Sequence, residues 1–559
     1  MRVVALVLLL MVVLATTPAA QPSLVLHGQP FFDGNMVLSL SDETAIGEQA
    51  FVAVGLTPLY TPVLTGKGPW HIGVLLTVLP IGPIPAMGRV DLPFPMPAED
   101  LSVVGLQMPV QGYVAGKLSN PAILTMDSPY LPATPIIELS PPEPSQGAGY
   151  GDTLALGDLN NDGITDLVVG AWFEDFSGVN KSGRVYVHWG PDFSTYMTLQ
   201  PVSPVPFGLF GANLVIADIT GDQVDDLVVG ETAGSPPIPG RNGLLHVFAG
   251  GAGFSSTPTF SIPSLGTGEV YTIFGRILAA GDFNGDLAPD LAVGIHKATV
   301  SGFSSAGRID VYWGPTYTTV QSIENPAPAA FDAFGVFLAV ADLTGDGIDD
   351  LIEGSGQDDV GGVPNIGSVH TFAGPSLALH KSIPNPLPQG FNSRFGDEVH
   401  AADLDGDGLA EVITVDLKNR VYIFWSPDFD TYTGIEKPQA LNTVTGNTAS
   451  YGYFVETADV NGDGFRDVLI SDVFEGVQSC ASAKEGTLFT ALGPFYSSFH
   501  VLPNPSSSCG DNFSWRITVG DVDGDAIEDV LMSSPTADEG GSLNSGLVYL
   551  FTGVPAAGQ

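Results

Sequence analysis

The sequence predicts an all-β fold, a seven-bladed β-propeller preceded by a small β-rich, sandwich-like domain. The first observation is composition, because 69 glycines and 45 prolines accompany a charged fraction of only 14%. That mixture is typical of many short strands joined by turns, and it does not suit long charged helices. The second observation is an acidic nine-residue motif that occurs seven times. The third is that aromatic and apolar residues around the motif repeat in the same register, which indicates one structural unit repeated along the chain.

The charge balance excludes several classes of partner. The 559 residues carry 61 acidic and 18 basic side chains, a formal net charge of −43. Nucleic acids and anionic membrane surfaces need a basic face, so neither is an expected partner. Apolar residues make up 44% of the chain, which is too many for a disordered acidic segment. We therefore expect a folded, monomeric protein.

Residues 1–20 have the pattern of a secretory signal peptide. Arg2 precedes an apolar run over residues 3–15, and small residues follow, with Ala19 and Ala20 at the expected cleavage site. The run is shorter than the roughly 20 apolar residues that a membrane-spanning helix needs. An uncleaved anchor is the alternative. We expect an exported protein with no membrane span after cleavage, either secreted and extracellular or held at the cell surface.

Two domains are expected after the signal peptide. Residues 21–132 hold no acidic motif and many prolines, with strand-like segments such as "HIGVLLTVLP", so we expect a small all-β domain without a recognisable site. The Pro-rich segment "SPYLPATP", residues 128–135, is the expected linker. Residues 133–554 hold the seven repeats of the propeller.

Each repeat is organised around the acidic motif. The first copy, "DLNNDGITD", starts at Asp158 and is followed by the apolar run "LVV". Six further copies follow at intervals of 56 to 64 residues and start at Asp218, Asp282, Asp342, Asp403, Asp459 and Asp521. An aromatic residue stands eight residues before each start, followed by glycine in six copies and by Ser514 in the seventh; the aromatic residues are Tyr150, Phe210, Phe274, Phe334, Phe395, Tyr451 and Phe513.

Four strands can be assigned to each repeat. The first lies between the aromatic residue and the motif, the second is the apolar run after the motif, the third resembles "GRVYVHWGP", and a looser fourth follows. Seven units of four short strands indicate a β-propeller. The last repeat ends after its third strand. We expect the segment around Ile136 and Leu139 to supply the missing strand and close the ring, because an open ring would expose strand edges to aggregation.

The acidic loop has the composition of a calcium site. Calcium takes six to eight oxygen ligands in flexible geometry, and alternate carboxylates on a tight turn supply them. Side chains at loop positions 1, 3, 5 and 9 would converge on the ion, with a backbone carbonyl at position 7, which is Ile164 in the first copy. A glycine at position 6 eases the turn in four loops, whereas Gln223, Leu287 and Ala526 stand there in loops 2, 3 and 7.

These positions name the expected ligands of up to seven calcium ions. In chain order they are Asp158, Asn160, Asp162 and Asp166; Asp218, Thr220, Asp222 and Asp226; Asp282, Asn284, Asp286 and Asp290; Asp342, Thr344, Asp346 and Asp350; Asp403, Asp405, Asp407 and Glu411; Asp459, Asn461, Asp463 and Asp467; and Asp521, Asp523, Asp525 and Asp529.

Two other interpretations of the loop are an EF-hand and a plain turn. An EF-hand does not fit, because its twelfth-position Glu is replaced by Val169 in the first copy and because the flanks are strand-like. Plain Asp/Asn/Gly turns are the second alternative. Position 5 is Asp and position 9 is acidic in all seven copies, and such clustered carboxylates repel one another without a cation. The repetition therefore favours metal binding.

The aromatic–glycine pair, the acidic loop and the third strand together resemble the FG-GAP repeats of the integrin α-subunit head, which also occur in many bacterial secreted proteins. The resemblance covers residues 135–554 and departs at Ser514. It implies that the acidic loop joins the first and second strands of a blade, so that calcium is structural and a ligand meets the opposite face. Trp172, Phe173, His296 and Phe303 are the aromatic candidates for contact on that face, and packing against neighbouring loops is the alternative.

The remaining signals concern redox state and catalysis. The only two cysteines, Cys480 and Cys509, are expected to form a disulfide in an exported protein. No nucleophile, zinc or phosphate-binding motif is present, so an enzyme is not expected. The expected function is an extracellular recognition or adhesion module that binds a protein or glycan ligand. The alternative is a carbohydrate-binding or polysaccharide-degrading protein that uses the face opposite the calcium loops.

Overall fold

The computed structural model divides the chain into two compact units, residues 1–129 with 555–559, and residues 130–554. It describes the strand backbone between residues 8 and 125. It also describes residues 135–553 apart from 233–242, 265–272, 389–391, 417–419, 439–449, 474–485, 498, 507–509 and 539–541. No helix in these described parts has the length and apolar character to cross a bilayer.

The first unit is built from strands alone. Its larger sheet has the order β10-β9-β1-β4-β7 with β11 on β9, a second sheet has the order β2-β3-β8, and β5 pairs with β6. The apolar run of the expected signal peptide lies in β1, and both that peptide and the role of residues 21–132 stay predictions. The strands are β1 (Leu8–Ala15), β2 (Ser23–His27), β3 (Asn35–Ser41), β4 (Gln49–Leu56), β5 (Pro62–Thr65), β6 (Gly68–His71), β7 (Val74–Pro83), β8 (Arg89–Pro95), β9 (Gln107–Val114), β10 (Lys117–Leu118) and β11 (Ala122–Thr125).

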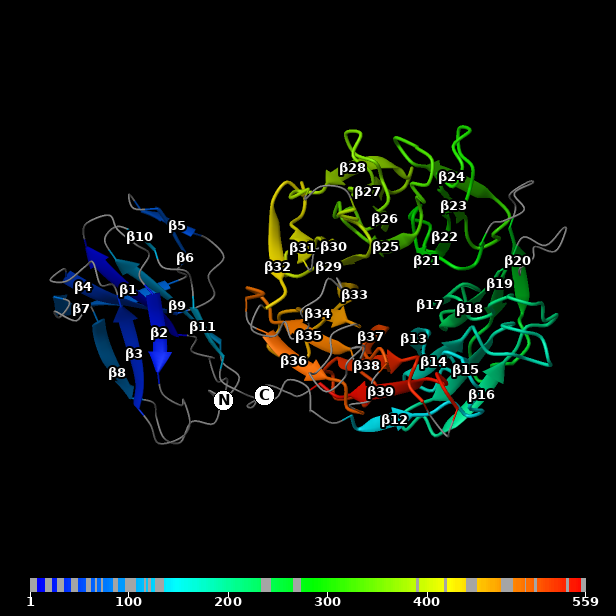
Figure 1. Ribbon diagram of the computed structural model, residues 1–559, viewed down its shortest axis with the longest axis horizontal. Coiled ribbons are helices and arrows are strands. Elements are labelled where there is room, and N and C mark those ends of the chain that lie inside the picture. The colour runs from blue at the N-terminus through cyan, green and yellow to red at the C-terminus, as the bar shows by residue number, and fades with distance from the viewer. Residues whose placement is uncertain are drawn as a thin grey trace. The chain divides into compact units, whose positions relative to one another are not determined.

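The second unit is a ring of seven antiparallel four-stranded sheets (Figure 1), so the predicted seven-bladed propeller is confirmed. The innermost strands of neighbouring blades contact one another around the whole ring. They are β13 (Thr153–Gly157), β17 (Leu214–Ala217), β21 (Leu278–Gly281), β25 (Phe337–Ala341), β29 (Val399–Ala402), β33 (Tyr451–Ala458) and β37 (Ile517–Gly520).

Three further strands complete each blade outward from the ring centre. The second strands are β14 (Asp166–Ala171), β18 (Asp226–Glu231), β22 (Asp290–Ile295), β26 (Asp350–Ser355), β30 (Glu411–Asp416), β34 (Asp467–Asp472) and β38 (Asp529–Ser534). The third strands are β15 (Arg184–Trp189), β19 (Leu244–Phe248), β23 (Arg308–Tyr312), β27 (Ser368–Ala373), β31 (Arg420–Phe424), β35 (Thr487–Ala491) and β39 (Leu547–Phe551). The fourth are β16 (Thr195–Leu199), β20 (Phe260–Pro263), β24 (Val320–Glu324), β28 (Ala378–Pro384), β32 (Tyr432–Glu436), β36 (Phe499–Pro503) and β12 (Ile137–Leu139).

The hydrophobic core lies between blades. Every residue of the seven second strands is buried, which explains why these segments read as continuous apolar runs without alternation. One cluster joins Tyr150, Leu167 and Val169 of blade 1 to Val548 and Leu550 of blade 7. Each blade therefore buries its face only against its neighbours, and the stability of one blade depends on the next.

The aromatic–glycine pair positions the start of each innermost strand. Phe274 is fully buried and meets Tyr312 of the third strand edge to face, with ring centroids 5.7 Å apart. Gly275 then takes φ 87°, a left-handed conformation that glycine adopts without strain. Ser514 takes φ 63° at the same place in blade 7, and its hydroxyl donates to the Thr487 carbonyl at 3.0 Å. A serine therefore replaces the glycine without a change of fold.

The ring closes within blade 7. β12 pairs antiparallel with β39, with Ile137 opposite Leu550, and the Ile136 amide donates to the Leu550 carbonyl at 2.9 Å. β12, the first strand of the propeller unit, thus supplies the outer edge of the last blade. The sequence predicted this position for it.

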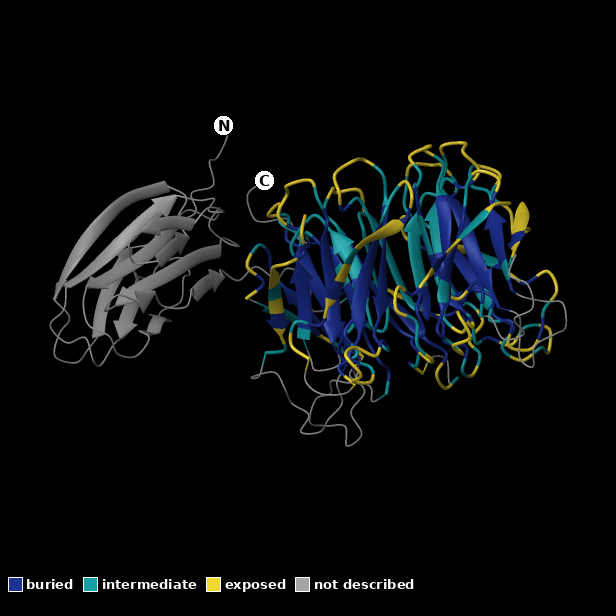
Figure 2. Ribbon diagram, turned by 90° about the horizontal axis from the view of Figure 1, so that it is seen from above, coloured by how far each residue is buried: buried dark blue, intermediate teal, exposed yellow. Residues whose placement is uncertain are grey.

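Loops at the ends of the strands form two faces of the ring, and Figure 2 shows the buried strands between exposed loops on both sides. The "acidic face" carries the seven acidic loops and the connections between third and fourth strands. The "opposite face" carries the connections between second and third strands and the crossovers between blades. The Phe207 amide in a crossover donates to the Asn180 carbonyl in the second-to-third connection, which holds these two kinds of segment together.

Candidate functional site: acidic loops and central channel

All seven acidic loops join the first and second strands of a blade, and their carboxylates organise the loop backbone in the same way. Asp158 at position 1 accepts the Gly163 amide at position 6 through Oδ2, at 2.8 Å. Asp162 at position 5 accepts the Ile164 amide at position 7, at 2.9 Å. Both hydrogen bonds recur in the other six loops. The acidic residues are therefore parts of one repeated geometry.

The position-9 carboxylate links the acidic loop to the next connection of the blade. Asp166 is fully buried, and its two oxygens accept the Leu159 amide at 3.1 Å and the Gly190 amide at 3.0 Å. The second of these amides lies between the third and fourth strands. The link to that connection is repeated by Asp226, Asp290, Asp350, Glu411, Asp467 and Asp529.

Burial makes the position-9 acids costly to ionise in the absence of a cation. It raises the pKa of Asp166 to about 6, although the two amide donors lower it, and the nearby Asp162 and Asp158 carboxylates add to the rise. Burial likewise raises the pKa of Asp290 and of Asp529 to about 6. A bound divalent cation reverses this balance because it stabilises the ionised form.

Loops 5 and 7 bring three carboxylates together. Among the described residues, oxygens of Asp403, Asp405 and Glu411 lie within 4.8 Å of one another, and so do those of Asp521, Asp523 and Asp529. Three converging hard oxygens fit a calcium ion, and they come from positions 1, 3 and 9. Position 5 is outside both groups. In the other loops position 3 is Asn or Thr, so their donor sets hold one carboxylate fewer.

The turn at position 6 does not require glycine. Gly347 takes φ 80° there, and Gln223, Leu287 and Ala526 take φ 69°, 68° and 69°. The three loops without the glycine therefore keep the same backbone, held by the position-1 carboxylate.

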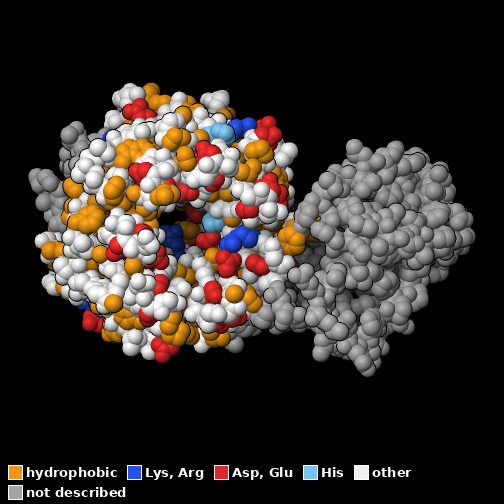
Figure 3. Space-filling model, turned by 180° about the vertical axis from the view of Figure 1, so that it is seen from behind, with side chains coloured by type: hydrophobic (Ala, Val, Ile, Leu, Met, Phe, Trp, Pro, Cys, Tyr) orange, Lys and Arg blue, Asp and Glu red, His pale blue; other side chains and the backbone are white. Residues whose placement is uncertain are grey.

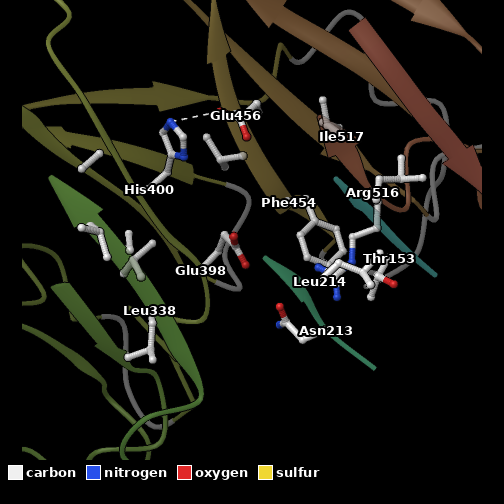
Figure 4. Close-up of a pocket in the computed structure, with 16 residues that line it drawn as sticks. Thr153, Asn213, Leu214, Leu338, Glu398, His400, Phe454, Glu456, Arg516 and Ile517 are labelled. Carbon is white, nitrogen blue, oxygen red and sulfur yellow. Dashed lines mark ion pairs between the residues drawn. The ribbon is translucent and has the colours of Figure 1, made fainter. Parts of the chain in front are cut away.

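The ring also encloses a polar central channel that the sequence reading missed. A cavity of about 350 Å³ is lined by residues from the innermost strands of six blades. Figure 3 shows the channel mouth on one face, with basic side chains in and beside it and acidic side chains nearby. Figure 4 shows Glu398 and Arg516 directed into the cavity from different sides, with Phe454 beside Arg516. Both charged residues directly precede an innermost strand, at its opposite-face end.

A signal for these residues was present in the repeat. The position two residues after the aromatic–glycine pair is Glu398 in blade 5, Phe454 in blade 6 and Arg516 in blade 7, and it is Thr153 and Asn213 in blades 1 and 2. Two residues further on, His400 and Glu456 of neighbouring blades form an ion pair of 3.1 Å. The framework positions keep one residue type around the ring, whereas these channel positions change chemistry from blade to blade.

The aromatic candidates on the opposite face are mostly covered. Trp172 and Phe173 stack on each other with centroids 4.5 Å apart, the Arg276 guanidinium lies 5.1 Å from the Trp172 ring, and the Lys181 ammonium lies 4.4 Å from the Phe173 ring. His296 is half-buried, and its burial lowers the pKa to about 4. Phe303 remains 44% exposed. Cys480 and Cys509 lie outside the described residues, so their disulfide stays a prediction.

Seven closed blades with one acidic loop each place the chain among the seven-bladed β-propeller proteins. Within that class the chain carries FG-GAP repeats: the FG-GAP repeat model matches residues 150–188, and the FG-GAP-like repeat model matches residues 383–470. The first match covers most of blade 1, and the second covers blade 5 and extends into the second strand of blade 6. The resemblance seen in the sequence is confirmed.

Two kinds of relative align with part of the chain. Human phosphatidylinositol-glycan-specific phospholipase D is 32% identical over 192 residues, which is 32% of this chain and 22% of that protein. Mouse integrin alpha-7 is 34% identical over 163 residues, 28% of this chain and 13% of that protein. The chain thus spans about a fifth or less of the length of these relatives. Among solved structures, BBS1N in complex with ARL6DN is similar with a TM-score of 0.45 and 12% identity, covering 75% of this chain and 96% of that chain.

Proposed function

We propose that the chain is an exported recognition module: a propeller whose acidic loops bind structural calcium and whose opposite face and channel mouth meet a ligand outside the cell. The observation that carries this proposal is a difference between two kinds of position within the repeat. Residues that build the ring recur in every blade, while the positions at the channel mouth include Asn213, Glu398, Phe454 and Arg516. A purely architectural ring has no need of such variety. The similarity to an integrin α-subunit supports an extracellular ligand of protein or glycan type.

The calcium part of the proposal assigns each loop a structural role. The ion would neutralise carboxylates that otherwise repel one another, and it would hold the first two strands of the blade together. Extracellular calcium modules bind with dissociation constants of about 0.1 to 1 mM. At about 10 mM calcium, each occupied loop then stabilises the fold by roughly 1.4 to 2.7 kcal/mol.

Thermal unfolding and calorimetric titration test the calcium sites. We expect a chelator to lower the Tm and calcium to restore it, with magnesium much less effective because it prefers rigid octahedral sites. Asp405→Ala in loop 5 and Asp523→Ala in loop 7 should each remove one calcium equivalent. The matched control is Asp428→Ala, an exposed turn aspartate outside the acidic loops. Unchanged Tm and protease resistance after chelation would show that the loops are plain turns.

A ligand screen tests the recognition role. The chain, with and without calcium, is applied to a glycan array and to a panel of extracellular-matrix proteins. Binding to a protein that depends on calcium supports the recognition module, and binding to glycans alone supports the carbohydrate alternative. The stacked and cation-covered Trp172 and Phe173 offer no open platform for a sugar ring, so we expect the protein ligand.

A further inference from the structure

The central channel holds a carboxyl group with an oxygen atom that has no hydrogen-bond partner among the described residues. Glu398 is half-buried, and its Oε2 is shielded from solvent and accepts no hydrogen bond within the described part of the chain. Burial raises the pKa of Glu398 to about 8; Arg516 lowers it, and Glu456 and Asp397 raise it further. A shielded polar atom of this kind destabilises the fold unless something pairs with it.

The same channel holds the guanidinium group of Arg516, whose terminal nitrogens can still donate hydrogen bonds. Arg516 donates from Nε to the Asp152 carbonyl at 3.0 Å, and its guanidinium carbon lies 3.9 Å from the centre of the Phe454 ring. It forms no ion pair of 4.0 Å or less with any described acidic residue. The stacking fixes the plane of the group. Its two terminal nitrogens therefore form a rigid fork, which suits a carboxylate held by two parallel hydrogen bonds.

Other polar groups of the channel already have partners or are neutral. The His400 Nε2 atom lies 3.1 Å from a carboxylate oxygen of Glu456. Asn213 donates to the Arg276 carbonyl at 3.1 Å, and Thr153 donates to the Gly211 carbonyl at 2.8 Å. The remaining lining includes apolar side chains such as those of Leu214 and Leu338. The Glu398 carboxyl group and the Arg516 guanidinium group are thus left to face a cavity of about 350 Å³, which is in the size range of small-molecule sites.

The two groups together select a ligand by charge. A simple cation would meet the Arg516 guanidinium, and a simple anion would leave the shielded Glu398 oxygen without the positive charge that favours its ionised form. A molecule with an anionic and a cationic end satisfies both. We propose that the channel binds a small zwitterion of the α-amino acid type, with its carboxylate on the Arg516 fork and its ammonium on Glu398.

Isothermal titration of the full chain in calcium-containing buffer near pH 7.5 tests this site. The probes are three zwitterions, L-alanine, L-glutamine and L-leucine, and the two half-molecules acetate and methylammonium. We expect at least one zwitterion to bind with one-to-one stoichiometry and to raise the Tm. The half-molecules should bind at least about tenfold weaker, because each lacks one charge-assisted contact of about 1.5 to 3 kcal/mol.

Two variants locate the site. Glu398→Gln removes the charge of the carboxyl group, and Arg516→Lys keeps the charge but removes the fork. Each should weaken zwitterion binding by about tenfold or more. The matched controls are Glu436→Gln and Arg420→Lys, the same chemical changes in an ion pair between the outer strands β31 and β32 of blade 5. They should leave binding unchanged.

Several outcomes overturn the inference. The inference is wrong if none of the three zwitterions binds. It is also wrong if both channel variants bind a zwitterion as tightly as the wild-type chain does. Acetate that binds as tightly as the best zwitterion shows an anion site, and equally tight methylammonium shows a cation site. Chelator and calcium titrations measure separately whether the acidic loops bind calcium. Failure of the calcium proposal can therefore be distinguished from failure of the zwitterion site.

Discussion

Glu398 is the residue that most clearly lowers the stability of the fold while offering a group for ligand binding. Its Oε2 atom is shielded and accepts no hydrogen bond from the described residues, and burial raises the pKa of the group to about 8. A glutamine or an apolar side chain would fit the same place at a lower cost. Residues that lower stability in this way are expected where a protein trades stability for activity, so Glu398 is the strongest single indication of a site in the channel.

The raised pKa of Glu398 makes a pH-dependent prediction. In the unfolded chain the group ionises near pH 4.5, whereas the folded chain keeps it protonated until about pH 8. The stability contributed by the wild-type residue is therefore complete below pH 4.5 and is lost as pH rises to 8. Glu398→Gln has no such titration. We expect the variant to be more stable than wild type by up to about 5 kcal/mol at pH 9 and equal to it at pH 4, because each pH unit between the two pKa values contributes about 1.4 kcal/mol.

Urea denaturation across this pH range measures the difference. Glu436→Gln, which removes one partner of an exposed ion pair, is the control and should not become more stable than wild type as the pH rises. A stability difference that stays constant between pH 4 and pH 9 would contradict the assignment.

At the scale of the element, the acidic loop is a turn whose shape comes from its side chains. The position-1 carboxylate accepts the position-6 amide whether or not glycine stands there. Leu287 therefore adopts φ 68° although its side chain is 91% exposed and gains little from packing. The left-handed conformation costs about 1 to 2 kcal/mol for a residue with a Cβ atom.

Leu287→Gly should consequently stabilise loop 3. We expect a gain of about 0.5 to 1 kcal/mol, because the relief of backbone strain exceeds the entropy that a glycine adds to the unfolded chain. Gly347→Leu in loop 4 is the reverse change, at a position where an added Cβ meets no atom within 4 Å, and it should cost a similar amount. Equilibrium denaturation of both variants checks the pair, and shifts of the same sign would rule out backbone strain as the cause.

At the scale of the molecule, the ring depends on closure and on the control of its charge. Contacts between loops tie blades together: the Asp349 carboxylate of blade 4 accepts the Asp282 amide of blade 3 at 2.8 Å, and Glu528 of blade 7 accepts the Asp459 amide of blade 6 at 2.8 Å. These links fix the acidic loops of blades 3 and 4, and those of blades 6 and 7, against each other. They also concentrate negative charge on one face of a chain whose formal net charge is −43.

Charge repulsion of this size should make stability depend on salt. We expect the Tm of the chelated protein to rise by a few degrees when sodium chloride is increased from about 20 mM to about 500 mM, because the Debye length falls well below the spacing between loops. Saturating calcium should make the dependence shallower, since bound cations neutralise the loops. Scanning calorimetry with potassium chloride as the comparison salt measures this. A Tm that falls with salt in both states would show that ion pairs outweigh the repulsion.

Much of this architecture is readable from the residues because the repeat is strict. Asp158 and its six equivalents mark each loop, Tyr150 and its equivalents mark the start of each blade, and the missing fourth strand of the last repeat points to the segment around Ile137. Each of these features is local in sequence and is repeated seven times, so chance patterns average out. A glycine at position 6 is not required, because the hydrogen bond from the Leu287 amide to Asp282 holds the turn, and a local rule about φ does not include that bond.

The sequence by itself determined the strand order, the number of blades and the placement of the acidic loops, because these follow from periodicity along one chain. Only the tertiary structure decided that Glu398 and Arg516 share a channel. They are 118 positions apart, in blades 5 and 7, and no local pattern relates them. The ring brings the ends of their strands to one cavity and shields the carboxyl group from water. Burial and the absence of a partner are properties of the closed ring, and they turn an ordinary glutamate into a candidate binding group.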